Sequence, residues 1–158
     1  MSRILGVDPG ASGALSCYCT KTELLEIYDM PVVEVKRGQR NVKQVNAPML
    51  ASLIKEISPN RAYVEAVHAM PGQGVSSMFA FGRALGVIEG SLAGLGVPFT
   101  LVSPREWTAA MRVKGGKDGS RNRAAELFPR HANLFSRVKD DGRADATLIA
   151  VFGAKVVE

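Results

Sequence analysis

The chain has 158 residues, a hydrophobic content of 46% and a formal net charge of +5. These values favour a single folded domain, residues 1–158, with a core of its own and without long disordered tails. No apolar run is long enough to span a bilayer, and the N-terminus lacks the layout of a signal peptide, so we expect a cytoplasmic protein.

The first half of the chain predicts a meander of three strands, followed by a helix and a fourth strand. The expected strands span residues 4–8, 13–20, 23–33 and 61–67. A tight turn at Pro9 and Gly10 follows the first strand. The basic stretch over residues 36–43 is expected to be a loop. The helix opens at Ala47 and ends near Ser58, with apolar residues at helical spacing on one face.

The second half of the chain predicts helices and one more strand. The expected helices span residues 75–95, 120–128 and a last segment that begins at residue 141 or 142. A fifth strand covers residues 97–102. Ser103 and Pro104 then form a helix start, with Trp107 on the apolar face of that short helix. Together the elements predict an α/β fold with a mixed five-stranded sheet flanked by helices.

Glycines recur at every fourth position of the long helix expected over residues 75–95. This glycine stripe consists of Gly82, Gly86, Gly90 and Gly94. Glycine inside a helix costs roughly 1 kcal/mol relative to alanine, so four on one face indicate that another element approaches closely. That element is either the domain's own sheet or a second subunit. Gly82, Gly86 and Gly90 are therefore candidate dimer-interface residues.

Two basic segments indicate a polyanionic partner. One covers residues 36–43 and the other covers residues 112–123. They are either solvated loops without a function or surfaces that contact the phosphate backbone of a nucleic acid. The candidate DNA-binding residues are Lys36, Arg37, Arg40, Lys43, Lys114, Lys117 and Arg121.

Acidic residues stand where apolar segments end. Asp8 closes the first predicted strand and Glu65 ends the apolar run of residues 62–64, while Asp140, Asp141 and Asp145 lie at the start of the last helix. Buried charge is costly unless something offsets it, and carboxylate oxygens are the ligands that Mg²⁺ and Mn²⁺ prefer. Two such ions about 4 Å apart clamp the attacking and leaving oxygens of phosphodiester cleavage. The pattern therefore predicts a two-metal nuclease site.

Several segments resemble the RuvC superfamily of Holliday junction resolvases. GVDPGASGALS is similar to its first-strand signature and AYVEAV to its fourth-strand glutamate. KDGSRNRAAELFP followed by KDDGRADATLIAVFG is closer to the branch that contains the plant chloroplast Holliday junction resolvase and related bacterial and phage proteins. The resemblance covers residues 4–153. It implies a ribonuclease H-like fold, a bacterial or phage-encoded protein, and convergence of Asp8, Glu65 and Asp145 at one sheet edge.

The resemblance also implies roles for the last acidic segment and for Lys117. Many bacterial resolvases of the superfamily place their last two acidic or metal-binding residues three apart, but here that spacing falls on Gly142. The closer branch has a Lys-Asp-x-Gly-Arg-Ala-acid pattern and so implies Asp140, whereas helix geometry alone favours Asp141. Lys117 would stabilise charge near the scissile phosphate. The implied catalytic and metal-binding acids are Asp8, Glu65, Asp140 and Asp145.

One hypothesis and two alternatives follow. The hypothesis is a crossover junction endodeoxyribonuclease with two Mg²⁺ or Mn²⁺ ions per active site, which cuts four-way junctions and related branched DNA and leaves 5′-phosphate ends. Paired cutting needs two active sites and so implies a homodimer, with no organic cofactor and no membrane partner. The alternatives are a non-catalytic branched-DNA-binding protein, against which the intact acidic set argues, and a ribonuclease H-like enzyme that acts on RNA–DNA hybrids.

Overall fold

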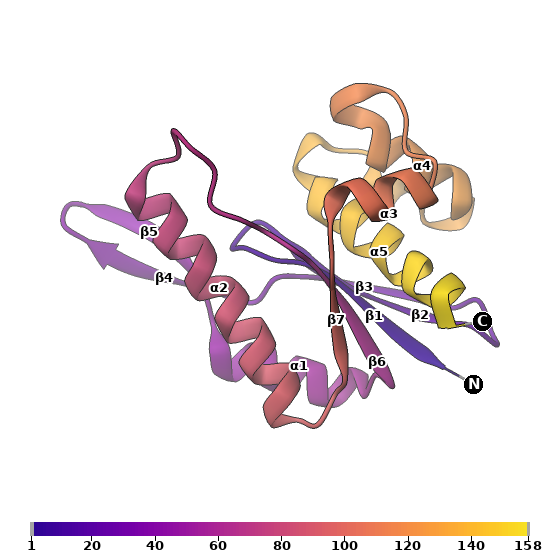
Figure 1. Ribbon diagram of the computed structural model, residues 1–158, viewed down its shortest axis with the longest axis horizontal. Helices are drawn as coiled ribbons and strands as arrows, with labels where there is room; N and C mark the ends of the chain where they lie inside the picture. Colours follow the sequence, from indigo (N-terminus) through magenta and orange to yellow (C-terminus); the bar gives the residue numbers. More distant parts are fainter. Residues whose placement is uncertain (1, 158) are drawn as a thin grey trace.

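The main sheet of the computed structural model, which describes residues 2–157, has five strands in the order β3-β2-β1-β6-β7 (Figure 1). Strand β1 is antiparallel to β2 and parallel to β6, so the sheet is mixed as expected. The strands are β1 (Arg3–Asp8), β2 (Ala14–Cys19), β3 (Leu25–Asp29), β6 (Arg61–Glu65) and β7 (Phe99–Val102).

The basic segment that was expected to be a loop is a β-hairpin. Strands β4 (Val32–Arg37) and β5 (Arg40–Val45) pair antiparallel and form a separate two-stranded sheet. Gly38 adopts a φ of +61° in the turn between them, a conformation that glycine reaches without strain. The strand expected over residues 23–33 was therefore wrong in extent, because β3 ends at Asp29. Figure 1 shows the hairpin extending away from the main sheet.

Two helices cover one face of the main sheet. Helix α1 (Ala47–Ile57) begins after Asn46, whose side chain accepts a hydrogen bond from a backbone N–H of the first turn. Helix α2 (Val75–Gly94) contributes Ala84, Ile88 and Leu92 to the same buried layer. Alternate side chains of β1 point into this layer, which forms one of the two hydrophobic cores.

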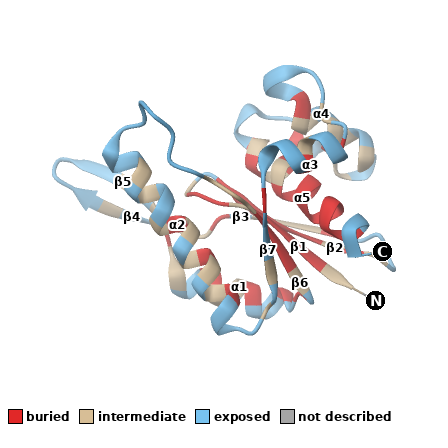
Figure 2. Ribbon diagram, viewed as in Figure 1, coloured by how far each residue is buried: buried red, intermediate tan, exposed pale blue. Residues whose placement is uncertain are grey.

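The opposite face carries the last helix, α5 (Asp141–Val157), directly on β1. A Cβ atom at Gly6 would lie 2.1 Å from the carbonyl oxygen of Ala146, so only glycine permits this approach. Gly153 allows the same closeness to the Tyr63 ring. Figure 2 shows that buried residues concentrate where the central strands meet α5, whereas the hairpin is largely exposed.

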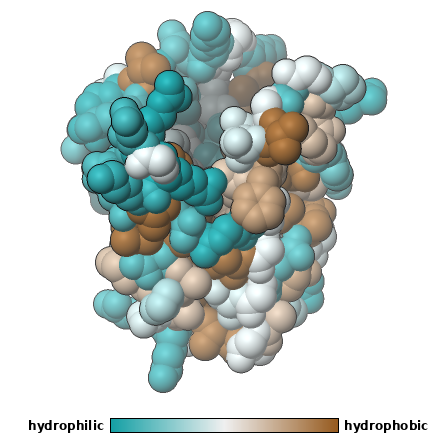
Figure 3. Space-filling model, turned by 90° about the vertical axis from the view of Figure 1, so that its left-hand side faces the viewer, coloured by the Kyte–Doolittle hydropathy of each residue, from teal (hydrophilic) through white to brown (hydrophobic). Residues whose placement is uncertain are grey.

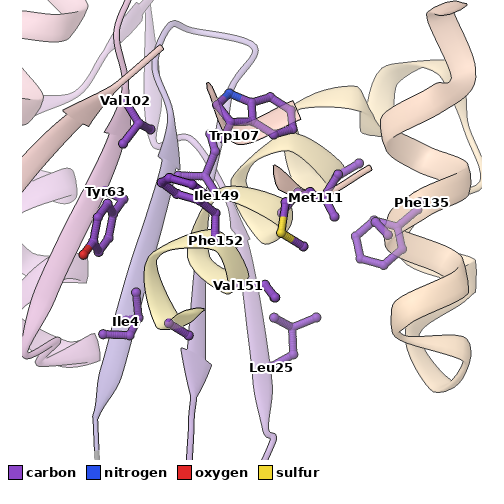
Figure 4. Packing of buried hydrophobic residues seen from close by; sticks show 14 residues of the cluster. Ile4, Leu25, Tyr63, Val102, Trp107, Met111, Phe135, Ile149, Val151 and Phe152 are labelled. Atoms are coloured by element: carbon purple, nitrogen blue, oxygen red, sulfur yellow. The ribbon is translucent and has the colours of Figure 1, made fainter. Parts of the chain in front are cut away.

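Shorter elements complete the cover over α5. They are α3 (Pro104–Ala110), η1 (Gly116–Asp118), α4 (Gly119–Leu127), η2 (Pro129–Phe135) and η3 (Val138–Asp140). Helix α4 thus begins one residue before the expected Ser120. In the second core, Tyr63 and Phe152 meet edge to face, and Trp107 lies at the margin near Val102 (Figure 4). None of the helices within residues 2–157 is long and apolar enough to cross a membrane.

The glycine stripe of α2 does not pack on the sheet. A Cβ atom at any of its four positions would meet nothing within 4 Å among residues 2–157, and all four positions are exposed. The interpretation of the stripe as close packing within the domain is therefore wrong. Its interpretation as a subunit interface stays a prediction, as does the extent of the single domain over residues 1–158.

Candidate active site

The parallel pairing of β1 with β6 brings two carboxylates to one edge of the sheet. Val7 is in register with Val64, so Asp8 and Glu65, the last residues of their strands, leave the pair side by side. Side chains alternate along a strand, and Asp8 therefore points to the same face as Gly6. Because α5 lies on that face, both strand ends open towards the start of the helix.

Helix α5 adds two more carboxylates at this edge. Asp141 and Asp145 are four residues apart and so share one face of the helix. Gly142 is buried, and a Cβ atom there would lie 3.0 Å from Oδ2 of Asp8, which shows how closely the helix start approaches β1. Asp8, Asp141 and Asp145 line the same groove. We call Asp8, Glu65, Asp141 and Asp145 the acidic cluster.

The members of the acidic cluster repel one another. Burial raises the pKa of Asp8 well above its usual value, and Asp145, Glu65 and Asp141 raise it further. The pKa of Asp145 rises to about 6, chiefly through burial, although a hydrogen bond from Ser120 opposes the shift. Burial also raises the pKa of Glu65 against the opposing effect of a hydrogen bond from Trp107. A bound cation would relieve this repulsion.

The donor set fits a hard divalent cation, because it consists of carboxylate oxygens alone. Within residues 2–157, however, no three acidic, histidine or cysteine side chains already surround a common point as the ligands of one ion do. Besides Asp145, which accepts a hydrogen bond from Ser120, two of the carboxylates have hydrogen-bond partners instead. Glu65 Oε1 accepts a hydrogen bond from Trp107 Nε1 at 3.0 Å, and Asp141 Oδ1 accepts one from Arg121 Nε at 2.7 Å.

Asp140 does not belong to the acidic cluster. It is 1% exposed, and Arg137 donates to it from the guanidinium group at 2.8 Å and from the backbone N–H at 2.9 Å. The guanidinium group of Arg143 lies 3.6 Å from its Oδ1 and also binds Asp29. These partners hold the pKa of Asp140 below its usual value. The structure thus contradicts the choice of Asp140 and brings Asp141 to the site.

Cations of the hairpin flank the acidic cluster. Lys36, Arg37, Arg40 and Lys43, the hairpin cations, are all exposed. Arg37 and Lys43 line the groove that contains Asp8, a cavity of about 430 Å³ between the hairpin, α2 and the start of α5. Figure 3, which faces the side of the hairpin, shows hydrophilic side chains gathered beside a hollow. An anionic chain could therefore lie over the carboxylates while its phosphates contact these cations.

Only some of the cations in the second basic segment, residues 112–123, are exposed. Lys114 and Lys117 are exposed. Arg121 has a side chain that is 11% exposed, and its guanidinium group bridges Asp141 and Asp118. The structure therefore does not support the expectation that Arg121 contacts DNA, because its guanidinium group forms an ion pair with Asp141 of the acidic cluster. The role of Lys117 near a phosphate stays a prediction.

Three neighbours of the acidic cluster were missed in the sequence. Trp107 fits the apolar face of α3, and nothing in its spacing indicates a carboxylate partner 42 residues away. Ser120 and Arg121 stand at the start of α4, in a segment whose basic character suggested phosphate contacts. They contact Asp145 and Asp141 only because α4 lies against the start of α5 in the folded chain.

Comparisons with known proteins found a sequence relative and solved structures with a similar fold. No protein-family model matches the chain. Over 80% of its length the chain is 28% identical to the Holliday junction resolvase MOC1, chloroplastic, of Chlamydomonas reinhardtii. T. thermophilus RuvC in complex with a Holliday junction substrate has a TM-score of 0.67 at 16% identity, covering 99% of this chain and 96% of that one. The chain therefore has the fold of RuvC.

A second solved structure has a similar fold. The yeast mitochondrial Holliday junction resolvase Ydc2 has a TM-score of 0.53 at 18% identity, covering 94% of this chain and 76% of that one. The expected ribonuclease H-like fold is confirmed. The chain spans 17% of the length of the algal relative, which is a chloroplast protein, so the expected bacterial or phage origin gains no support from it.

Proposed function

We propose that this protein is a resolvase of the RuvC superfamily, a metal-dependent endonuclease that resolves four-way junctions and related branched DNA by paired phosphodiester cleavage. The observation that carries the proposal is the convergence of four carboxylates from β1, β6 and α5 at one sheet edge, beside a groove lined by exposed cations. Similarity to proteins that are named Holliday junction resolvases supports the same substrate class.

The acidic cluster would hold Mg²⁺ or Mn²⁺, with two ions per active site. When bound, such ions supply an activated water and stabilise the charge on phosphate oxygens. The chain supplies the oxygen ligands and holds them close together, although burial and mutual repulsion raise the pKa values of Asp8 and Asp145. A protein that merely binds DNA has no use for repelling carboxylates at a DNA-facing edge, and this argues for catalysis.

The exposed cations would position the DNA backbone over these carboxylates. A polyanion is repelled by bare carboxylates, so positive charge around the groove favours its approach. The hairpin cations lie on one flank and Lys114 and Lys117 precede α4 on another part of the chain. We propose that Lys117 stabilises charge on the phosphate during cleavage, while the hairpin cations contribute to binding alone.

Paired cutting requires two active sites, and we propose the exposed face of α2 as the contact between two subunits. Around the glycine stripe this helix exposes large apolar side chains, with Val75 84%, Phe79 66% and Phe81 47% exposed. Exposed apolar patches of this kind are typical of protein contacts. The missing side chains of the stripe would let two such helices approach closely.

A cleavage assay tests the proposal. The wild-type protein is incubated with a labelled mobile four-way junction, with and without MgCl₂, beside Asp8→Asn and Asp145→Asn. We expect paired metal-dependent cuts with 5′-phosphate ends from the wild type, and junction binding without cleavage from both variants. A linear duplex and an RNA–DNA hybrid of the same sequence serve as controls.

Two results would overturn the proposal. Junction binding by the wild type without cleavage in either Mg²⁺ or Mn²⁺ would indicate a non-catalytic branch-binding protein. Cleavage of the hybrid without cleavage of the junction would indicate a ribonuclease H-like enzyme.

A further inference from the structure

We infer that Trp107 is a positioning residue. It holds one carboxylate oxygen of Glu65 and thereby presents the other oxygen to the remaining carboxylates of the acidic cluster. Trp107 Nε1 lies 3.0 Å from Glu65 Oε1. The inference rests on the proposed function, because it concerns the support of a proposed metal ligand. It has a direct spectroscopic consequence, since Trp107 is the sole tryptophan of the chain.

The fold fixes this contact from both sides. Glu65 is in register with Val102 in the parallel pair of β6 with β7. Ser103 caps α3 immediately after β7, and Pro104 starts the helix, so Trp107 stands one turn beyond the strand end. The Trp107 side chain is buried in the second core, which contains side chains of α5, with 2% of its surface exposed. The donor is therefore held in place beside the carboxylate.

The chemistry of the donor distinguishes this contact from the ion pair between Arg121 and Asp141. An indole N–H is a neutral donor with a single proton, so it occupies part of one carboxylate oxygen and leaves the charge of Glu65 uncompensated. Arg121, by contrast, brings a full positive charge to Asp141. A neutral donor is suited to orienting a ligand that must still attract a cation, as the partners of metal ligands commonly do.

A purely structural explanation would be that Glu65 merely satisfies a buried indole N–H, since buried donors are rarely left unpaired. The two explanations differ in what happens at the ion. If the contact only completes the core, the environment of Trp107 should not respond when an ion binds. If it orients Glu65, ion binding on the other oxygen should alter the indole hydrogen bond and the emission of Trp107.

Fluorescence of the wild-type protein without DNA tests this difference. Titration with MgCl₂ should produce a saturable change in Trp107 emission at the concentrations at which calorimetry detects ion binding, and MnCl₂ should quench more strongly. Glu65→Gln retains a carbonyl acceptor for the indole but lacks the charge, so its emission should show no saturable response. Ion binding without any change in wild-type emission would overturn the inference.

A pair of variants tests the energetic consequence. Trp107→Phe keeps an aromatic ring but removes the N–H, and Phe152→Leu reduces the same core without touching Glu65. We expect Trp107→Phe to weaken ion affinity by ~10-fold or more, as for the loss of an orienting partner of a metal ligand. Phe152→Leu should keep the wild-type affinity. Equal losses in both variants, or none in Trp107→Phe, would overturn the inference.

The outcomes separate this inference from the proposed function. If the emission of the wild-type protein responds to Mg²⁺ but the protein cuts no junction, the nuclease proposal is refuted. The inference about Trp107 is then still supported. A Trp107→Phe variant that cuts junctions with wild-type metal dependence would refute the inference alone. If calorimetry finds no ion binding with or without junction DNA, both fail.

Discussion

Replacing Asp145 with asparagine should stabilise the metal-free protein and abolish its proposed cleavage activity. The pKa of Asp145 rises from 3.8 to about 6 on folding, with burial as the main cause and Glu65 and Asp141 as further causes. Between these values the native state binds a proton that the unfolded state has already lost. Stability therefore falls as the pH rises through this window and stays reduced above pH 6.

The size of the effect follows from the shift. About two pKa units correspond to roughly 3 kcal/mol at pH 8, and the partial exposure of Asp145 reduces this to ~1–3 kcal/mol. Asparagine is neutral and its carbonyl can still accept the hydrogen bond from Ser120. For a chain of this length ~2–4 °C accompany each kcal/mol, so the melting temperature in EDTA should rise by roughly 2–12 °C at pH 8.

Thermal unfolding in EDTA at pH 8 and pH 4 measures the effect, with Glu34→Gln on the exposed hairpin as the control. The gain in stability of Asp145→Asn over the wild type should shrink at pH 4 to well under half of its value at pH 8, because the wild-type carboxyl is protonated at pH 4. The control should change stability by less than ~0.5 kcal/mol at either pH. Saturating MgCl₂ should stabilise the wild type more than the variant. Equal or lower stability of Asp145→Asn at pH 8, or a gain independent of pH, would refute the reasoning.

Four further predictions concern other parts of the molecule. Asp140→Asn should lower the free energy of unfolding in urea by ~1–3 kcal/mol, because Asp140 is buried against two guanidinium groups, and unchanged stability would contradict this role. Replacing the hairpin cations with glutamine should reduce the salt dependence of junction binding by about 0.9 log unit per lost phosphate contact; an identical slope would mean that they contact no DNA. Lys117→Ala should lower the single-turnover rate ~100-fold at saturating protein, whereas weaker binding with a normal rate would make it a binding contact. Gly86→Leu should give a stable monomer in sedimentation that nicks junctions without resolving them, and a fully active dimer would exclude the α2 interface.

The sequence predicted the main sheet well because its strands have apolar residues on buried faces. It missed the hairpin because β4 and β5 have no such face. Their side chains are exposed or partly exposed except for Val45, so the two strands have no continuous buried face. Cross-strand pairing and the turn at Gly38 hold the hairpin, and a run of cations around a glycine gives little sign of either.

Glycine spacing was also a poor guide to close packing. The regular stripe on α2 faces no other element of residues 2–157, whereas single glycines on β1 and α5 allow close approaches between elements. At Gly6 the neighbour is the backbone of Ala146, and at Gly153 it is the ring of Tyr63. Each close approach joins residues far apart in the sequence, so no local period could have marked them. The repeat of glycines along α2 indicated that they share one face of the helix, but it did not indicate which element, if any, contacts that face.

Gly142 explains why the acidic residues of α5 are four apart. A side chain at position 142 would meet the backbone of Ser12 at 2.8 Å and Oδ2 of Asp8 at 3.0 Å, so the helix start can approach β1 only with glycine there. That closeness leaves no room for an acid three residues before Asp145. Asp141, one turn before Asp145, is the nearest position on the same helix face. Asp140 then lies on the far side of the helix start, where Arg137 and Arg143 neutralise it. The resemblance to the resolvase branch could identify the segment, but the choice between two adjacent aspartates depended on which side of α5 meets Asp8.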